Sequence, residues 1–380
     1  MADPTGDALA QEREALRDTV RTLLDRTSSE ADVRRLMETE TGYDGAVWTQ
    51  AAEGLGLTGL AIPEEFGGSG FGPMELAVVF EEMGRALYGG PFLSTVGLAA
   101  SALLASGDDA AKKEWLPGIA AGTTTATLAL TEESSAWTAD AITTTATTDG
   151  DAARLSGVKW YVLDGHTADL ILVVARTSGG IGLFAVAADA AGLTREPMAT
   201  MDATRKMARL TFDNVAAQPV GAQTEGWQIV EPALRLGAVM LAAENVGGAQ
   251  RCLDMAADYA RERIQFGRPI GSFQAVKHRL ANLLIEVEQA KSASYFAARE
   301  AATAEESGQS ADLALAASLA KAYTGDAFFH TAADNIQIHG GIGFTWEHPA
   351  HLYFKRAKTN QLLLGSSSYH RALVADLVGI

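Results

Sequence analysis

The sequence predicts an α+β protein of three parts: an N-terminal α-helical domain, a middle β-barrel or β-sandwich domain and a C-terminal four-helix bundle. Apolar residues recur at helical spacing in the first and last parts, whereas short Thr- and Val-rich runs between turn signals fill the middle. The length of 380 residues also exceeds one ordinary hydrophobic core, so two or three domains are expected. We place the domains at residues 1–125, 126–225 and 226–380.

The first part is helical from about residue 7 to residue 121. Its first apolar residues fall on one helix face at helical spacing: Leu9, Leu16, Val20, Leu23 and Leu24. Residues 63–70 form a Gly-rich loop, after which residues 74–87 resume the helical period. The loop lacks the GxxxxGK[ST] spacing of a phosphate cradle and follows no clear strand, so we interpret it as a plain connection.

The middle part carries short predicted strands at residues 141–148, 157–163, 169–175, 182–187 and 208–215. Asp149-Gly150-Asp151 and Ser178-Gly179-Gly180 separate them as turns. Strands at this spacing favour a small barrel or sandwich. No helix-length segment alternates with them, which argues against a dinucleotide-binding βαβ fold here.

The last part is helical to its end. Helices are predicted at residues 230–263, 273–305, 311–337 and 367–378. Long antiparallel neighbours with short connections favour a four-helix bundle.

Composition restricts the function classes. The formal net charge of −17 argues against a nucleic-acid or membrane-surface binder, because such proteins depend on basic patches. The single cysteine, Cys252, excludes an intrachain disulfide and a Cys-rich zinc framework. The acidic N-terminus has no apolar core of a signal peptide, and no apolar run approaches the roughly 18 residues of a membrane span. We therefore expect a cytoplasmic protein.

Two short stretches carry unusual chemistry. Residues 261–274 read RERIQFGRPIGSFQ, in which Arg263, Gln265 and Phe266 supply a cation, an amide and an aromatic ring before Gly267 and Pro269 break the helix. Alone, this stretch is also typical of a helix–helix connection whose basic residues complement the helix dipole. The second stretch, residues 337–344, reads QIHGGIGF.

Together the two stretches resemble the acyl-CoA dehydrogenase family, in which both belong to the flavin-adenine dinucleotide (FAD) site. The order of the three parts also resembles that family, and further similar segments are residues 57–70, Leu130-Thr131-Glu132, Gly157-Val158-Lys159 with Tyr161, and Gly365-Ser366 before the last helix. The resemblance covers nearly the whole chain.

The resemblance implies a set of cofactor contacts. Thr131 would bond the flavin ring system, and Tyr161 would lie against the isoalloxazine where the family usually has Trp. Six further residues would contact the adenosine diphosphate part of FAD that is bound mainly by a neighbouring subunit: Arg263, Gln265, Phe266, Gln337, Gly340 and Gly341. Ser366 and Ser368, at the final turn before and in the last helix, would be further cofactor contacts. These residue types suit the ligand, because Arg offers a fixed cation to a pyrophosphate and glycine lets backbone N–H groups approach it.

The sequence departs from the family at the catalytic base. Many members carry a Glu directly before the Gly-Thr of the last loop, where this chain has Leu364, and others carry it early in the first bundle helix, where this chain has Gly237. Glu244 is the alternative candidate, because it is the one ionisable residue between Arg235 and Arg251 and its helical neighbours are apolar. A buried carboxylate is either functional or paired, so a structural Glu that binds a core Arg or Lys, or caps a neighbouring helix, stays open.

Histidines complete the candidates. His339 precedes two glycines and is interpreted as a structural or cofactor contact. His348, His351 and His370 lack the spacing of a metal site, so we expect no metal.

The resemblance implies an enzyme that oxidises an acyl-CoA to its trans-2,3-enoyl-CoA with FAD and passes electrons to electron-transferring flavoprotein. In lacking Glu at both usual positions, the chain resembles an actinobacterial subset that assembles as α2β2 heterotetramers and acts on bulky steroid-side-chain thioesters. A homo-oligomer is the other assembly that stays open. Two alternatives stay open. One is a flavin oxidase or monooxygenase on the same scaffold, and the other is a catalytically silent subunit that completes a neighbour's FAD site.

Overall fold

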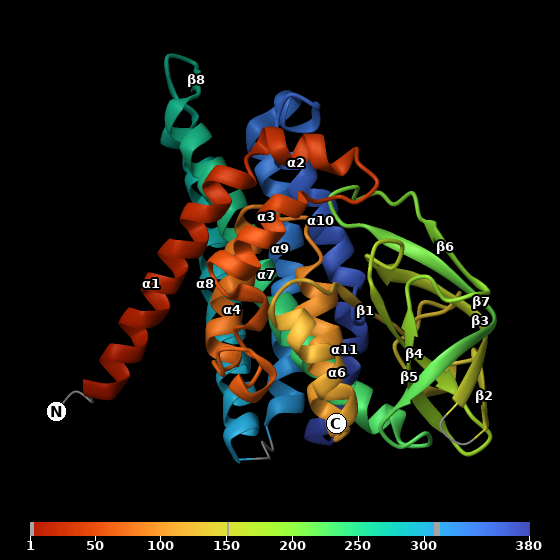
Figure 1. Ribbon diagram of the computed structural model, residues 1–380. Coiled ribbons are helices and arrows are strands. Elements are labelled where there is room, and N and C mark those ends of the chain that lie inside the picture. The colour runs from red at the N-terminus through yellow and green to blue at the C-terminus, as the bar shows by residue number, and fades with distance from the viewer. Residues whose placement is uncertain (1–3, 150–151, 308–311) are drawn as a thin grey trace. The chain divides into compact units, whose positions relative to one another are not determined.

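The computed structural model describes residues 4–149, 152–307 and 312–380 (Figure 1). Its contacts divide the chain into two compact units. A helical unit comprises Met1–Val33, Pro73–Tyr88 and Ala238–Ile380, and a barrel unit comprises Arg34–Gly72 and Gly89–Gly237. Each unit is described by itself.

The barrel unit is built on a sheet whose strands close on themselves. The pairing runs β4–β2–β3–β7–β5 and returns to β4, while β1 pairs with β4 and β6 pairs with β7. The strands are β1 (Ala126–Ala129), β2 (Thr145–Asp149), β3 (Ala152–Leu163), β4 (Leu170–Arg176), β5 (Ile181–Ala187), β6 (Leu193–Pro197) and β7 (Met207–Val220). Of the two predicted architectures, a β-barrel or a β-sandwich, the closed ring is the barrel, and it leaves few free strand edges.

The interior of this barrel explains why its strands were visible in the sequence. Leu155, Ile171, Phe184 and Leu210 belong to one buried apolar cluster. Each of the five predicted strands overlaps β2, β3, β4, β5 or β7, whereas β1 and β6 were not predicted. β1 has only four residues, and β6 is polar and mostly exposed, so neither shows a clear apolar alternation. The predicted turn at Asp149-Gly150-Asp151 lies partly outside the described residues.

Short helical segments accompany the barrel strands. They are α3 (Gly45–Thr49), η1 (Gln50–Gly54), η2 (Leu57–Gly59), η3 (Glu64–Phe66), η4 (Leu93–Ala100), α5 (Ser101–Ala105), α6 (Asp109–Ala120) and η5 (Ala139–Ala141). α2 (Glu30–Met37) carries the chain from the helical unit into the barrel unit.

The helical unit packs long helices around α9. Its helices are α1 (Pro4–Thr27), α4 (Pro73–Arg85), α7 (Gly226–Glu262, which begins in the barrel unit), α8 (Gln274–Ser307), α9 (Leu313–His339), α10 (Ala350–Leu362) and α11 (Ser367–Val378). α8, α10 and α11 all pack against α9. The predicted helices correspond to α7, α8, α9 and α11. Across the described ranges, no helix combines the length and apolarity that a membrane span requires.

α10 was not predicted because polar side chains interrupt its buried face. The residues that this helix buries include His351, Arg356 and Asn360 beside Leu352 and Tyr353. An apolar period is the main sequence signal for a helix, so a helix that buries charged and amide side chains has little signal. Those polar side chains bear directly on the candidate site.

Two glycines let α4 and α7 cross at very short range. A Cβ atom built on Gly84 would lie 1.9 Å from the carbonyl oxygen of Glu244, and one built on Gly247 would lie 1.7 Å from the carbonyl oxygen of Glu81. Real atoms do not approach so closely, so neither position accepts a side chain without separating the helices. The crossing fixes Glu244 against α4.

α1 is held on α4 by a partly buried charge network. The Arg17 guanidinium donates to Glu81 (3.1 Å) and Glu82 (3.0 Å), and Tyr295 of α8 donates its hydroxyl to Glu81 at 2.9 Å. Arg21 donates to Glu82 as well, at 2.7 Å. The network offsets the cost of burying two adjacent carboxylates.

The α4–α7 crossing leads to a test. We expect Gly247→Ala to lower the free energy of unfolding by about 3 kcal/mol, because the added methyl group forces two packed helices apart. Gly45→Ala is the control, since a Cβ at Gly45 meets no atom within 4 Å, and we expect it to change stability by less than about 0.5 kcal/mol. Urea unfolding followed by circular dichroism measures both; equal midpoints would contradict the close crossing.

Candidate functional site

A two-residue β-hairpin projects between α7 and α8. β8 (Ile264–Gln265) pairs with β9 (Arg268–Pro269), and the chain returns through η6 (Ile270–Ser272) into α8 (Figure 1). Phe266 and Gly267 form the tip with φ of 53° and 78°, the geometry of a type I′ turn. An aromatic residue with positive φ is uncommon. Here it directs the Phe266 ring outward, where 91% of the residue is exposed.

The polar residues of this hairpin are open to a ligand. Arg263 is exposed, and its guanidinium has no ion-pair partner among the described residues. The Gln265 amide donates to the neighbouring Ile264 carbonyl, at 2.8 Å, and its side chain is exposed. The prediction of a broken helix at Gly267 and Pro269 is confirmed, although the break is a strand pair and not a simple loop.

The second motif lies at the end of α9, beside the last turn of α7. The ring of Tyr259, in the last turn of α7, stacks on His339, the last residue of α9, with centroids 4.3 Å apart. η7 (Gly340–Phe344) follows at once. A Cβ on Gly340 or Gly341 would meet no atom within 4 Å, and both are exposed, as is Gln337. Backbone groups are therefore accessible at this turn.

His339 is held as a structural ring. Its Nδ1 lies 2.8 Å from the Asn335 carbonyl oxygen, and burial lowers the pKa of the imidazole. Because the His339 ring is stacked on Tyr259 and bonded to the helix backbone, it supports the turn that follows at Gly340–Phe344.

Three large apolar side chains are exposed on or directly beside these two segments. Phe266, Phe344 and Trp346 are 91%, 82% and 62% exposed. Exposed apolar residues of this size are typical of a surface that another molecule covers.

In the barrel unit, Thr131 is attached directly to β3. Trp160 donates its backbone N–H to the Thr131 carbonyl (2.9 Å), and the Thr131 hydroxyl donates to the Trp160 carbonyl (2.5 Å). Tyr161, the next residue, has φ of 56° and is 38% exposed. The structure thus brings the two predicted flavin-ring residues to neighbouring positions.

Two buried titratable side chains hold the last loop, between α10 and α11, by hydrogen bonds. Lys321 of α9 donates to the Gly365 carbonyl (3.0 Å), and His370 of α11 donates Nε2 to the Leu364 carbonyl (2.9 Å). Burial lowers the pKa of Lys321 to about 7 and, together with the nearby Lys321 charge, that of His370 to about 4. Leu364 has φ of 58° and is only 4% exposed.

The two serines predicted in this loop differ in their surroundings. The Ser366 hydroxyl accepts from Tyr369 N (3.2 Å) and caps α11, whereas the Ser368 side chain is exposed. The cap gives Ser366 a structural role whatever else it contacts.

Glu244 is buried, as predicted, and it is paired. Its Oε1 accepts from the Arg356 guanidinium at 3.0 Å and from the Asn360 amide at 3.1 Å. Arg356 also donates to the Tyr88 carbonyl (3.3 Å), and Asn360 donates to Asn245 (3.0 Å). The carboxylate therefore belongs to a polar network in the core of the helical unit. Such a pair is what the structural alternative for Glu244 predicts.

Sequence reasoning missed Arg356, Lys321 and Trp160. Arg356 and Lys321 are buried cations on helices, and a basic residue in a helix is ordinarily read as exposed. Trp160 lies directly before Tyr161, and its backbone, not its ring, is what engages Thr131.

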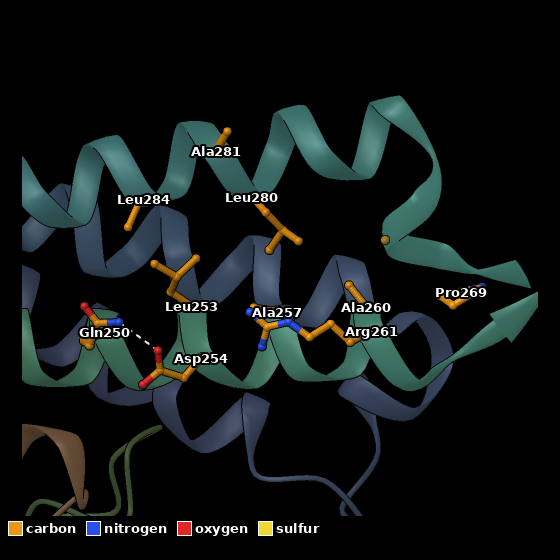
Figure 2. Close-up of a pocket in the computed structure, with 11 residues that line it drawn as sticks. Gln250, Leu253, Asp254, Ala257, Ala260, Arg261, Pro269, Leu280, Ala281 and Leu284 are labelled. Atoms are coloured by element: carbon orange, nitrogen blue, oxygen red, sulfur yellow. Dashed lines mark hydrogen bonds between the residues drawn. The ribbon is translucent and has the colours of Figure 1, made fainter.

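A groove of about 600 Å³ lies between α7 and α8 (Figure 2). Leu253 of α7 and Leu280 and Leu284 of α8 line it, with Arg261 and Pro269 at one end. None of the predicted cofactor residues lines this groove. Among the residues described, no group of three His, Cys, Asp or Glu side chains has an arrangement that could hold a metal ion.

Comparison with protein-family models decides the family. The N-terminal, middle and C-terminal domain models of acyl-CoA dehydrogenases match residues 10–123, 127–215 and 224–379. The chain belongs to the acyl-CoA dehydrogenase family. The predicted family and its order of helical, β and helical domains are confirmed, and the chain is an oxidoreductase of that family.

Individual relatives agree. The chain is 37% identical to the acyl-CoA dehydrogenase IpdE2 of Mycobacterium tuberculosis over 94% of both chains, and 32% identical to the acyl-CoA dehydrogenase FadE27 of the same species over 92% of both. Among solved structures it is similar to a variant of the Tcur3481-Tcur3483 steroid ACAD (33% identity, TM-score 0.87, 98% of both chains). It is also similar to the ChsE4-ChsE5 complex from Mycobacterium tuberculosis (29% identity, TM-score 0.87, 97% of both chains).

The anchored last loop of this acyl-CoA dehydrogenase homologue leads to a prediction. Leu364→Glu places a carboxylate where many relatives carry their base, but on a loop that Lys321 and His370 hold with the side chain buried. We expect little or no gain in turnover, measured as thioester-dependent dye reduction. A gain of about tenfold or more, the low end of what a positioned base contributes, would show that this position only lacked a carboxylate.

Proposed function

We propose that this chain takes part in FAD-dependent α,β-dehydrogenation of a bulky acyl-CoA thioester, within an oligomer whose subunits share the cofactor. The observation that carries the proposal is the pair of open segments at one end of the helical unit. Arg263 and Gln265 on the hairpin, and Gly340 and Gly341 on the turn after α9, are all exposed. A bulky steroid-like acyl group is supported by the similarity to a steroid acyl-CoA dehydrogenase.

The residues present fit FAD. Arg263 offers a planar cation for the pyrophosphate, and the exposed backbone of Gly340 and Gly341 can approach phosphate oxygens because no Cβ intervenes. Thr131 and Tyr161 supply a hydroxyl and an aromatic ring at adjoining positions in the barrel unit. A flat ring beside a hydroxyl oxygen suits a flavin.

Bound FAD would supply the hydride acceptor for the substrate Cβ. The protein then has to orient the thioester, exclude water and accept the proton from Cα. We propose Glu244 as the proton acceptor that this chain can offer, because positions 237 and 364 are glycine and leucine. Arg356 and Asn360 both donate to Oε1 and so fix the orientation of the carboxylate that would receive the proton.

A second candidate function is favoured by the same ion pair. A carboxylate bonded to a fixed guanidinium keeps its charge and is a weak base. In this alternative the chain is a subunit of a heteromeric acyl-CoA dehydrogenase that completes the FAD site while its partner subunit supplies the base. The similarity to the ChsE4-ChsE5 complex supports a heteromeric assembly.

We further propose electron-transferring flavoprotein as the electron acceptor, as the family resemblance implies. An oxidase or monooxygenase would differ in one measurable respect, because its reduced flavin would reoxidise rapidly in air. Stopped-flow reoxidation in aerated buffer, with and without electron-transferring flavoprotein, separates these reactions.

The hairpin cation gives one prediction. Arg263→Ala should lower the flavin-to-protein ratio by about tenfold and loosen the oligomer, because a charge-assisted contact of about 1.5–3 kcal/mol to the pyrophosphate is lost. The matched control is Arg299→Ala on α8, an exposed arginine whose ion-pair partner is the neighbouring Glu300. Flavin absorbance and light scattering report the two effects. Full flavin content in an intact assembly of Arg263→Ala would count against the shared site.

Glu244 gives the decisive prediction. Glu244→Gln keeps the size and an acceptor oxygen for Arg356 but removes basicity, so the anaerobic rate of flavin reduction by a CoA thioester should fall about 100- to 10,000-fold. The control is Glu81→Gln, another buried and ion-paired glutamate, which should keep the native rate.

The alternative has its own signature. If the partner subunit supplies the base, Glu244→Gln reduces flavin at the native rate in the assembled enzyme, and its defect is in folding. In either case, leaving Arg356 buried without its counter-charge should lower the free energy of unfolding by about 3–5 kcal/mol, so the rate of flavin reduction is the measurement that separates the two. Urea unfolding of the same samples measures this loss.

A further inference from the structure

The strand that carries Tyr161 contains an extra residue. Lys159 of β3 stands opposite Leu210 of β7, and Val162 stands opposite Ala208, so three steps along β3 match two along β7. Such a bulge bends a strand and re-aims a side chain. Tyr161 lies in it with φ of 56°, a backbone conformation that costs a non-glycine residue roughly 1–3 kcal/mol and has to be held by its surroundings.

The bulge is held by the segment that contains Thr131. A bulged residue loses its ladder partners, and here Thr131 supplies replacements for Trp160. The Trp160 N–H bonds the Thr131 carbonyl (2.9 Å), and the Thr131 hydroxyl bonds the Trp160 carbonyl (2.5 Å). The positions of Thr131 and Tyr161 are therefore not independent.

A buried ion pair fixes the same two segments on either side of these bonds. The Lys159 ammonium is fully buried and donates to Glu132 Oε1 (2.8 Å) and to the Leu130 carbonyl (2.9 Å). Glu132 in turn accepts from the backbone N–H groups of Thr143 (2.9 Å) and Thr144 (2.8 Å). Lys159 thus contacts the residues directly before and directly after Thr131.

The charges are consistent with a tight pair. Burial lowers the pKa of Lys159 to about 8. For Glu132, burial opposes ionisation, but hydrogen bonds from Lys159, Thr143 and Thr144 outweigh it and lower the pKa to about 2. A buried ion pair contributes little net stability compared with apolar residues of the same volume, and its best-attested use is to fix register.

We propose that Glu132 and Lys159 are positioning residues for the flavin ring, holding Thr131 and Tyr161 in one fixed arrangement through the β3 bulge. The inference rests on the proposed FAD function. Neither residue touches the cofactor in this assignment, since their charged atoms are bonded to each other and to backbone groups. They act by keeping the two hydrogen bonds between Thr131 and Trp160 formed, so that the bulge keeps its geometry.

The test uses Lys159→Met, which keeps the length of the side chain and removes the ammonium. In the flavin-free protein, the Trp160 amide should exchange with deuterium about tenfold faster, while amides elsewhere in β3 and β4 stay protected. In the loaded assembly, the Kd for FAD should rise about tenfold, as expected when a preorganised contact is loosened. Lys206→Met is the matched control, because Lys206 also donates to a backbone carbonyl in the barrel unit, that of Met37 at 2.7 Å, without contacting the bulge.

A second variant guards against misfolding. Glu132→Gln keeps the shape and an acceptor oxygen but removes the charge, and it should move both readouts in the same direction by a smaller factor. Native exchange at Trp160 together with a native Kd in both variants would overturn the proposal. So would a loosened bulge with an unchanged Kd, or an equal rise in Kd for Lys206→Met.

Failure of the underlying function looks different. A native chain that binds no FAD, alone or with candidate partner subunits, would refute the FAD site and with it the positioning role. The exchange of the Trp160 amide would still show whether the ion pair closes the bulge.

Discussion

The helical unit depends on the burial of one ion pair, Glu244 with Arg356. Glu244 lies where α7 presses on α4, with its carbonyl oxygen in the space that a side chain at Gly84 would need. Arg356 reaches across from α10 to Glu244 and to the Tyr88 carbonyl just beyond α4. Separating α7 from α10 would leave a charge unpaired in the core, and the glycine crossing ties α4 to α7, so the three helices fold into one arrangement together. The glycine crossing makes the pair possible because it removes the side chains that would separate the helices.

The same pair frames the question of catalysis. A general base has to accept a proton from the substrate, whereas a guanidinium at 3.0 Å favours the charged, unprotonated carboxylate. The two requirements conflict unless substrate binding changes the surroundings of the carboxylate. A heteromeric assembly removes the conflict, because one subunit can then keep Glu244 for stability while the other carries the base. The Leu364 loop is compatible with either origin of the base, because Lys321 and His370 bond its backbone carbonyls and so hold its conformation.

Sequence reasoning recovered features that depend on local pattern and missed those that depend on tertiary pairing. The range predicted for the last helix, residues 367–378, coincides with α11, because its Ser366 cap and its C-terminal Gly379 are local signals. α10 had no such pattern, since Arg356 and Asn360 occupy its buried face. Glu244 was predicted to be buried, but its partner lies 112 residues away and could not be identified from spacing. The strand bulge at Tyr161 was invisible for a related reason, because the register of β3 is defined only by β7 and by Thr131.

The candidate site therefore divides into supports that one chain provides and contacts that it leaves open. Lys159 with Glu132, Lys321 with His370, and Arg356 with Glu244 are all buried and hydrogen-bonded within one unit each. Arg263, Phe266 and the glycines after α9 are exposed. In the proposed function, the exposed groups would be satisfied by a cofactor shared with another subunit, and the buried groups would hold the residues around it in place. In that proposal the Phe266 ring, which the turn with positive φ leaves 91% exposed in this chain, would be covered when the subunits assemble.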